Sequence, residues 1–200
     1  MKKYELTTNT KVFDGKTLYR IRALVSFGTV NAGDLGGYIE KEDNLSQAGN
    51  AWVYGNAQVY GNAWVYGNAW VSDNARVCGN ARVYDNARVS GNARVSGNAD
   101  YLTIGPIGSR HDTTTFYRRK DGVTMVSCGC FHDTLDAFEM RVKKVHHGTP
   151  HEAAYLAAIA CARARVRTKP EDSNDVVAMA GDRIHTGQRG DDADGACDEG

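Results

Sequence analysis

Nine copies of one six-residue unit follow one another without insertion between Gly49 and Tyr101. Each copy carries Asn-Ala at its centre, from Asn50-Ala51 to Asn98-Ala99, and most copies have Val two residues after the Ala. Alternation along a short Ala-x-Val strand directs Ala and Val to one face and x to the other. The residues between these strands are mainly Gly, Asp and Asn, which tolerate tight turns. Because such short strands cannot bury their apolar face alone, the fixed period predicts a stacked parallel β-helix.

Three hexads are expected to close one coil, so residues eighteen positions apart should stack about 4.8 Å from each other. This register predicts three inward columns of valine: Val53, Val71 and Val89; Val59, Val77 and Val95; Val65 and Val83. Residues 35–40 keep the same phase less perfectly, with Leu35 and Ile39 expected at the Val and Ala places. We therefore expect about four coils, one degenerate and three regular.

This pattern resembles the hexapeptide-repeat, left-handed β-helix family over about residues 30–104. Four segments are in addition similar to hexapeptide-repeat proteins of bacteriophages and prophages: residues 35–40, 105–110, 113–116 and 127–131. The resemblance implies left-handed coils, a homotrimer as the usual assembly and a phage context. The similarity to phage proteins implies no particular activity, whereas the resemblance to the wider hexapeptide-repeat family implies acyl transfer as an alternative, because many of its members are acyltransferases.

The chain divides into four predicted parts. A β cap covers 1–29, with a hairpin signal at Asp14-Gly15, and the β-helix covers 30–104. A small α+β module covers 105–167, with a second hairpin at Asp121-Gly122. Residues 168–200 hold nine acidic and three basic residues, a net charge of 3 − 9 = −6, without an apolar period. This last part is predicted to be a disordered acidic tail.

Two helices are expected in the C-terminal module. The first should run from about residue 134 to 147, with Asp133 as its N-cap. The second should begin with Thr149 as N-cap and Pro150 as first helical residue, with Glu152 completing a capping box.

The composition is that of a modest soluble protein, which we expect to be cytoplasmic, and the resemblance to phage proteins implies the cytoplasm of a bacterial host cell. Of 200 residues, 42% are hydrophobic and 24% are charged, and neither a membrane span nor a signal peptide is recognisable. The five cysteines are odd in number and scattered, which argues against a disulfide framework. Cys128 and Cys130 should point the same way from one short strand, but no second pair with zinc spacing follows. No metal and no cofactor are predicted.

The outward x positions change from aromatic to basic along the repeat: Trp52, Gln58, Trp64, Trp70, Arg76, Arg82, Arg88, Arg94 and Asp100. Three projecting tryptophans, Trp52, Trp64 and Trp70, are too much apolar surface for water, so they are expected to form a homotrimer contact or to bind a host protein. Arg88 above Trp70 suits a cation–π pair. Arg76 above Arg94 is unfavourable unless an anion, a carboxylate or an aromatic face lies between the two guanidinium groups. The candidates for a neutralising group are Asp73, Asp85, a neighbouring subunit or a phosphate-bearing ligand.

These arginines favour a small anionic ligand. A cleft lined by Arg, Tyr and Trp suits a nucleotide, because bases stack on aromatic rings and Arg holds phosphate. The Gly-rich residues 105–110 form either an anion site or a simple connector. The candidate ligand-binding residues are Arg76, Arg88, Arg94, Ser109, Arg110, Thr113, Thr115, Tyr117 and Arg118.

Other functions have less support in the sequence. Acyl transfer, the alternative, needs a general base, yet the coils contain no His, and only His111 and His132 are placed to reach a neighbouring subunit. Extended nucleic acid is disfavoured because the arginines divide among three sides of the coil. A polymerising scaffold would need open ends, which the two predicted caps cover. No catalytic residue is assigned.

Overall fold

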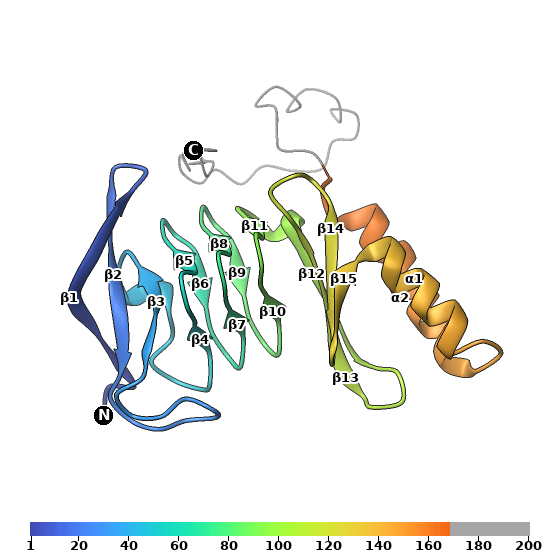
Figure 1. Ribbon diagram of the computed structural model, residues 1–200, viewed down its shortest axis with the longest axis horizontal. Coiled ribbons are helices and arrows are strands. Elements are labelled where there is room, and N and C mark those ends of the chain that lie inside the picture. The colour runs from blue at the N-terminus through green and yellow to red at the C-terminus, as the bar shows by residue number, and fades with distance from the viewer. Residues whose placement is uncertain (169–200) are drawn as a thin grey trace, which may run out of the picture.

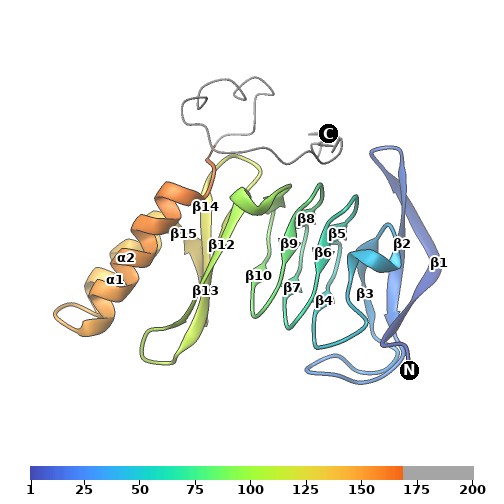
Figure 2. The same cartoon turned by 180° about the vertical axis from the view of Figure 1, so that it is seen from behind.

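The computed structural model describes residues 1–168. They form an elongated molecule, with a β hairpin at one end, a β-solenoid in the middle and a sheet covered by two helices at the other end (Figure 1). Figure 2 shows the same order from behind, with the N-terminus at the end opposite the helices. The predicted acidic tail lies outside the described residues from Lys169 onward. Within the described part, no helix is long and apolar enough to cross a membrane.

The solenoid makes about three turns of short strands. Its strands are β4 (Trp52–Val53), β5 (Gln58–Val59), β6 (Trp64–Val65), β7 (Trp70–Val71), β8 (Arg76–Val77), β9 (Arg82–Val83), β10 (Arg88–Val89) and β11 (Arg94–Val95). They pair in parallel with partners eighteen residues away, in the orders β4-β7-β10, β5-β8-β11 and β6-β9. The mainly β fold and this register are thus confirmed, while the direction of winding and the fourth coil stay predictions.

The interior of the solenoid is the predicted core of Ala and Val. Every repeat Val from Val53 to Val95 is 0% exposed, and each repeat Ala before Ala99 is at most 1% exposed. At one corner the Asn50 amide donates to Asn68, and the Asn68 amide donates to Asn86. Closely packed apolar columns and polar corner ladders explain why a six-residue period specifies this fold.

The first irregular strand, β3 (Leu35–Ile39), corrects one expectation. Tyr38 pairs with Gln58 and Ile39 with Val59, an offset of 58 − 38 = 20 residues. Ile39 therefore stands at a Val place and is fully buried, whereas Leu35 is 55% exposed. The 3-10 turn Glu42–Asn44 lies in the segment that carries the longer offset. The predicted assignment of Leu35 and Ile39 is wrong because the six-residue phase is shifted here.

The N-terminal cap consists of β1 (Tyr4–Phe13) and β2 (Lys16–Ala23), which form the predicted hairpin around Asp14-Gly15. The hairpin joins the solenoid sheet in the order β1-β2-β3-β5-β8-β11. Residues before β3 also cover Trp52, whose ring meets Tyr4 at 6.1 Å and Phe27 at 5.4 Å between centroids. Trp52 is 1% exposed, so the expectation that it projects into solvent is wrong.

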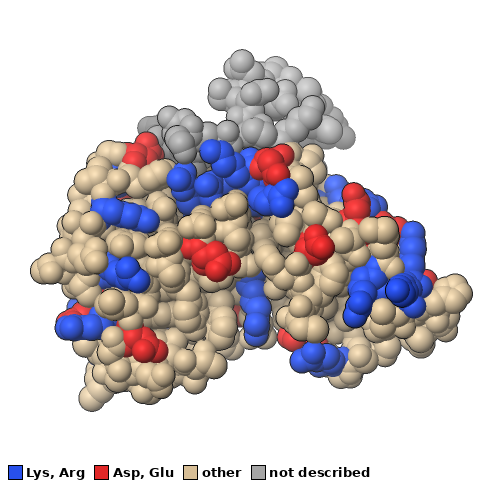
Figure 3. Space-filling view, viewed as in Figure 1, with Lys and Arg blue, Asp and Glu red and all other residues tan. Residues whose placement is uncertain are grey.

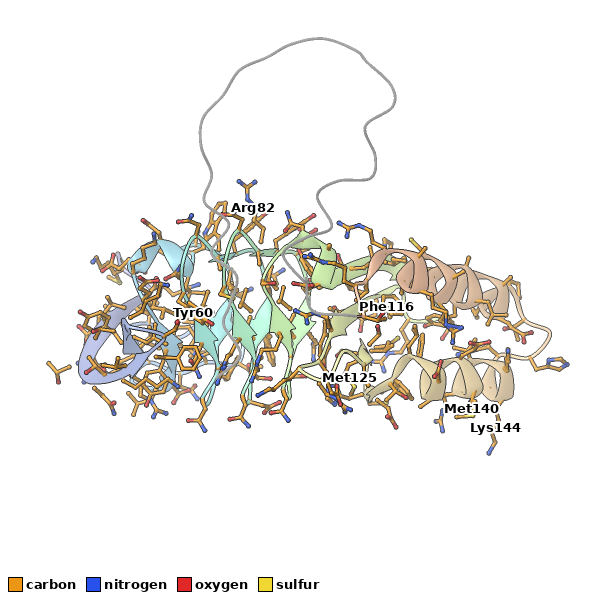
Figure 4. The ribbon with its side chains drawn as sticks, turned by 90° about the horizontal axis from the view of Figure 1, so that it is seen from above. Tyr60, Arg82, Phe116, Met125, Met140 and Lys144 are labelled. Carbon is orange, nitrogen blue, oxygen red and sulfur yellow. The ribbon has the colours of Figure 1, made fainter. Side chains whose placement is uncertain are left out.

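The C-terminal module is an antiparallel sheet of β12 (Tyr101–Ile107), β13 (Asp112–Arg118), β14 (Thr124–Cys128) and β15 (Phe131–Thr134), followed by α1 (Leu135–Val145) and α2 (Pro150–Arg165). Both helices lie on the face of the sheet that is turned away from the solenoid (Figure 1). Phe116 of β13 is buried between the sheet and the helices (Figure 4). Its ring lies beside that of Phe138, which in turn lies beside Tyr155. The module therefore has a core of its own.

The helix starts differ in detail from those predicted. Thr134, not Asp133, is the N-cap of α1, and its hydroxyl accepts a hydrogen bond from the Ala137 N–H at 3.3 Å. Thr149 and Pro150 begin α2 as expected, but the capping box is wrong. The Thr149 hydroxyl donates backward to the His146 carbonyl at 2.7 Å, while the Glu152 carboxylate accepts from the Gly148 N–H. These two hydrogen bonds within the turn between α1 and α2 thus take the place of the predicted capping box.

Candidate functional site

A hollow of about 460 Å³ opens in the C-terminal module. It is surrounded by the loop between β12 and β13, the turn between β14 and β15, and residues of α1 and α2. Its apolar lining is Phe131, Phe138, Val142 and Val145. Its polar lining includes Ser109, Arg110, Asp112, His132, Asp133, Arg141, His146 and Tyr155. A concave apolar surface with a few convergent polar groups is the usual form of a small-molecule site.

Gly108 positions the loop that carries Ser109 and Arg110. Its φ is +72°, and a Cβ at this position would lie 1.9 Å from the Tyr155 hydroxyl oxygen. Only glycine therefore lets the loop approach α2 so closely. Because Tyr155 is buried in the module core, this contact fixes Arg110 relative to the helices.

Two guanidinium groups line the hollow. Neither Arg110 nor Arg141 forms a hydrogen bond or an ion pair within residues 1–168. The two carboxylates nearby are already engaged locally, since Asp112 accepts from the Thr113 N–H and Asp133 from the Thr134 N–H, both at 2.7 Å. The exposed arginines are thus the groups left available to an anion.

Tyr155 and Cys128 form the polar part of the inner wall. The Thr114 hydroxyl donates to the Cys128 sulfur at 3.2 Å, and that sulfur lies 3.9 Å from the Tyr155 hydroxyl. Burial is the main cause that raises the pKa of Tyr155 to about 12, and the neighbouring Cys128 is the second cause. Its hydroxyl therefore stays neutral near pH 7. Cys128 ends β14 while Cys130 lies in the turn before β15, so the expectation of two thiols on one strand is wrong.

Only Ser109 and Arg110 of the predicted ligand residues line this hollow. Thr113 is half-buried on β13, and Thr115 is buried, where its hydroxyl accepts from the Arg88 N–H at 3.1 Å. Thr115 therefore belongs to the contact between module and solenoid.

Arg118 has a structural role in place of the predicted ligand contact. Its Nε lies 3.2 Å from Asp100 Oδ1, and the two side chains are 8% and 1% exposed. Asp100 also accepts from Ser96 and Gly97 through Oδ2, and Arg167 Nε lies 3.4 Å from Oδ1. Asp100 was expected on the outer surface, which is wrong, because the 3-10 turn Asn98–Asp100 takes the chain out of the solenoid here.

The arginines of the solenoid lie apart from the hollow. The Arg76 guanidinium lies 4.0 Å from the Phe13 ring centroid, so the cap provides an aromatic face as its cation–π partner. Arg94 is paired in register with Arg76 and donates to the Asn74 and Ala93 carbonyls. Arg88 lies 5.0 Å from the Trp70 ring, as predicted.

Ser90, Tyr117 and His132 meet where the solenoid joins the module. The Ser90 Oγ lies 2.9 Å from His132 Nε2 and 3.1 Å from the Tyr117 hydroxyl, which itself lies 2.5 Å from Nε2. Burial raises the pKa of Tyr117. The role of Ser90 could not be read from the sequence, where it looks like an ordinary corner residue of the repeat.

Arg141, His146 and Tyr155 were also missed, although the sequence contained part of the signal. Phe138 and Val142 are four residues apart and so share one face of a helix, and a residue beside Val142 borders that face. No group of three or more His, Cys, Asp or Glu side chains that could hold a metal is found among residues 1–168.

The fold and the hollow together define a β-solenoid protein with a small α+β module at one end. A family model described as "YdcK Beta solenoid repeat" matches residues 57–73, 75–90 and 87–99. These segments span β5 to β11 and do not include the hollow, so the similarity concerns the repeat and not the site. No curated protein matches the sequence significantly.

Proposed function

We propose that this protein is a non-enzymatic binding protein that holds a small anionic ligand with an apolar body in the hollow of the C-terminal module. The observation that carries the proposal is a pair of guanidinium groups, Arg110 and Arg141, that have no hydrogen-bond or ion-pair partner among residues 1–168 and lie beside an apolar lining. Guanidinium binds phosphate or carboxylate bidentately. The rings of Phe131 and Phe138 would cover the apolar body.

A homotrimer in the cytoplasm of a bacterial host cell is the assembly that we propose. Trp64 is 41% exposed and Trp70 is half-buried, so the sides that carry them offer apolar surface to a second copy or to a host protein. The left-handed winding and the phage context are proposed from the sequence resemblance. A polymerising scaffold has less support, because the β1–β2 hairpin and the C-terminal sheet lie at the two ends of the solenoid.

Extended nucleic acid also has less support. On the face shown in Figure 3, the Lys and Arg side chains form separate groups with acidic side chains between them. A continuous basic stripe would be expected for a nucleic-acid surface.

Calorimetric titration with phenyl phosphate, inorganic phosphate and phenol tests the proposed site. Phenyl phosphate should bind more tightly than either fragment, because it alone presents both the ring and the anion. Arg110→Gln and Arg141→Gln should each weaken its binding about tenfold, the loss expected for one charge-assisted contact. Lys144→Gln removes a charge from α1 at a side chain that points away from the molecule (Figure 4), and should leave binding unchanged. Equal binding by all four proteins would refute the site.

Acyl transfer is a second candidate because a hydroxyl and an imidazole are in contact. The Ser90 Oγ at 2.9 Å from His132 Nε2 has the geometry of a nucleophile beside a general base. A fluorophosphonate probe should then label Ser90, and Ser90→Ala should prevent labelling. The binding proposal predicts no labelling of either protein.

A further inference from the structure

Three aromatic rings stack along one corner of the solenoid, away from the hollow described above. The Trp64 and Tyr66 centroids lie 4.1 Å apart with an interplanar angle of 25°, and Tyr66 and Tyr84 lie 5.2 Å apart at 11°. Trp64 is 41% and Tyr84 is 37% exposed. We call these three residues the aromatic column. Face-to-face stacking inside the column leaves only its end faces for a further ring.

A second hollow, of about 340 Å³, adjoins one end of the aromatic column. Tyr66 and Tyr84 line it and Trp64 does not, so it lies at the Tyr84 end. Its other lining residues include Arg82, Asn98, Leu102 and Arg165. The volume is within the range of sites for small molecules.

The hollow exists because the repeat stops here. Tyr84 stands eighteen residues after Tyr66, one coil further along, and the next position in this series is Leu102. The turn Asn98–Asp100 has by then taken the chain out of the solenoid, and Leu102 lies on β12 and packs toward the module core. The aromatic column therefore ends one ring short of where the module begins.

The charge of this hollow favours an anion. Arg82 on β9 is exposed and projects outward from the solenoid (Figure 4), and Arg165 is the last residue of α2. Neither guanidinium forms an ion pair in the part of the chain that the structure describes, and no carboxylate is among the lining residues. Burial raises the pKa of Tyr66 and Tyr101, so these phenols stay uncharged beside an anion.

We propose that this second hollow binds a mononucleotide, with the base stacked on Tyr84 and the phosphate held by Arg82 and Arg165. Stacking on an aromatic ring is tolerant of base identity, whereas the two arginines select for phosphate. Asn98 and Thr103 supply polar groups for the sugar or the base edge. This site lies outside the hollow of Arg110 and Arg141 and does not depend on the function proposed there.

The test is calorimetric titration of the full chain with ADP, adenosine and ribose 5-phosphate. ADP should bind at least about tenfold more tightly than either fragment, because only ADP uses both the ring and the arginines. Tyr84→Leu, which keeps an apolar side chain but removes the ring, should weaken ADP binding about tenfold. Arg82→Gln and Arg165→Gln should also weaken ADP binding about tenfold. In each of these two variants the affinity for ADP should depend less on salt concentration than in the parent, because one charge that attracts the phosphate is gone.

Arg88→Gln is the matched control, because Arg88 is an exposed solenoid arginine on another side, above Trp70. It should bind ADP within about twofold of the parent. Circular dichroism of each variant establishes that it is folded. No ADP binding at 1 mM, or unchanged ADP binding by folded Tyr84→Leu, overturns the proposal.

Discussion

Replacing Asp100 by Asn should weaken the interaction that stabilises the C-terminal module against the solenoid. The Asp100 carboxylate is 1% exposed, and its Oδ1 faces Arg118 at 3.2 Å and Arg167 at 3.4 Å. Its Oδ2 accepts from the Ser96 N–H and hydroxyl, both at 2.8 Å, and from the Gly97 N–H at 3.1 Å. Asn keeps the shape but leaves the Arg118 guanidinium buried without a counter-charge.

Removal of one partner from a buried ion pair costs about 3–5 kcal/mol, a large part of the total stability of a typical domain. We expect a loss of this size in the free energy of unfolding, measured by urea titration with circular dichroism. Hydrogen exchange should locate the loss at β12 and β13 while β4 and β7 stay protected, since neighbouring coils support each other locally. Asp121→Asn, which breaks the exposed Arg119–Asp121 pair, should leave unfolding nearly unchanged.

A double-mutant cycle isolates the pair from the change in shape. Arg118→Met alone should destabilise the protein as Asp100→Asn does, while the double variant should lose clearly less than the sum of the two. If Asp100→Asn lowers the free energy of unfolding by less than about 1 kcal/mol, the reasoning is refuted. A loss that small is typical of a solvent-exposed ion pair and not of a buried one. Additive losses would refute it as well.

Three further predictions test the cap, the pH dependence and the corners. Trp52→Ala should lower the free energy of unfolding by about 3–5 kcal/mol, and Trp64→Ala by far less, because only Trp52 is covered by the cap. Burial lowers the pKa of Lys3 from 10.5 to about 8, so the unfolded chain holds more protons between these values. The urea midpoint should therefore rise from pH 8 towards pH 10, where buried tyrosines begin to oppose it. Lys3→Met should reduce the rise to the part that Lys11 contributes, because burial lowers the pKa of Lys11 as well. Gly49→Ala should destabilise more than Gly91→Ala in thermal melts, because both have positive φ but a Cβ at Gly49 would lie 2.5 Å from the Gly67 carbonyl.

The period of the repeat was enough to predict the solenoid, because one short motif specifies both the inward face and the register. Val77, for example, pairs with Val59 and Val95 as the eighteen-residue coil requires. The same period could not predict what covers an outward residue. Trp52 occupies an x position like Trp64, yet residues from the first thirty, which carry no such period, bury it.

The candidate site could be predicted only where it is local in sequence. Ser109 and Arg110 belong to one Gly-rich turn, and that turn does line the hollow. Arg141 and Tyr155 come from two helices whose placement depends on tertiary packing, so no spacing in the sequence relates them to Arg110. Arg118 was misread for the same reason, because its partner Asp100 looked like one more outward residue of the repeat.

Both hollows lie where the regular coils have ended, and the geometry of the coil explains this position. Within the repeat, residues eighteen apart stack in register, so each outward side chain fills the space above its neighbour, as Tyr66 does beside Tyr84. A row of this kind forms ridges and flat sides but encloses no volume. The turn Asn98–Asp100 and the sheet that follows break the register and leave concave surfaces at the end of the aromatic column and beside α1. The two binding sites that we propose would therefore both lie at the irregular end of the solenoid, where a concave surface can form.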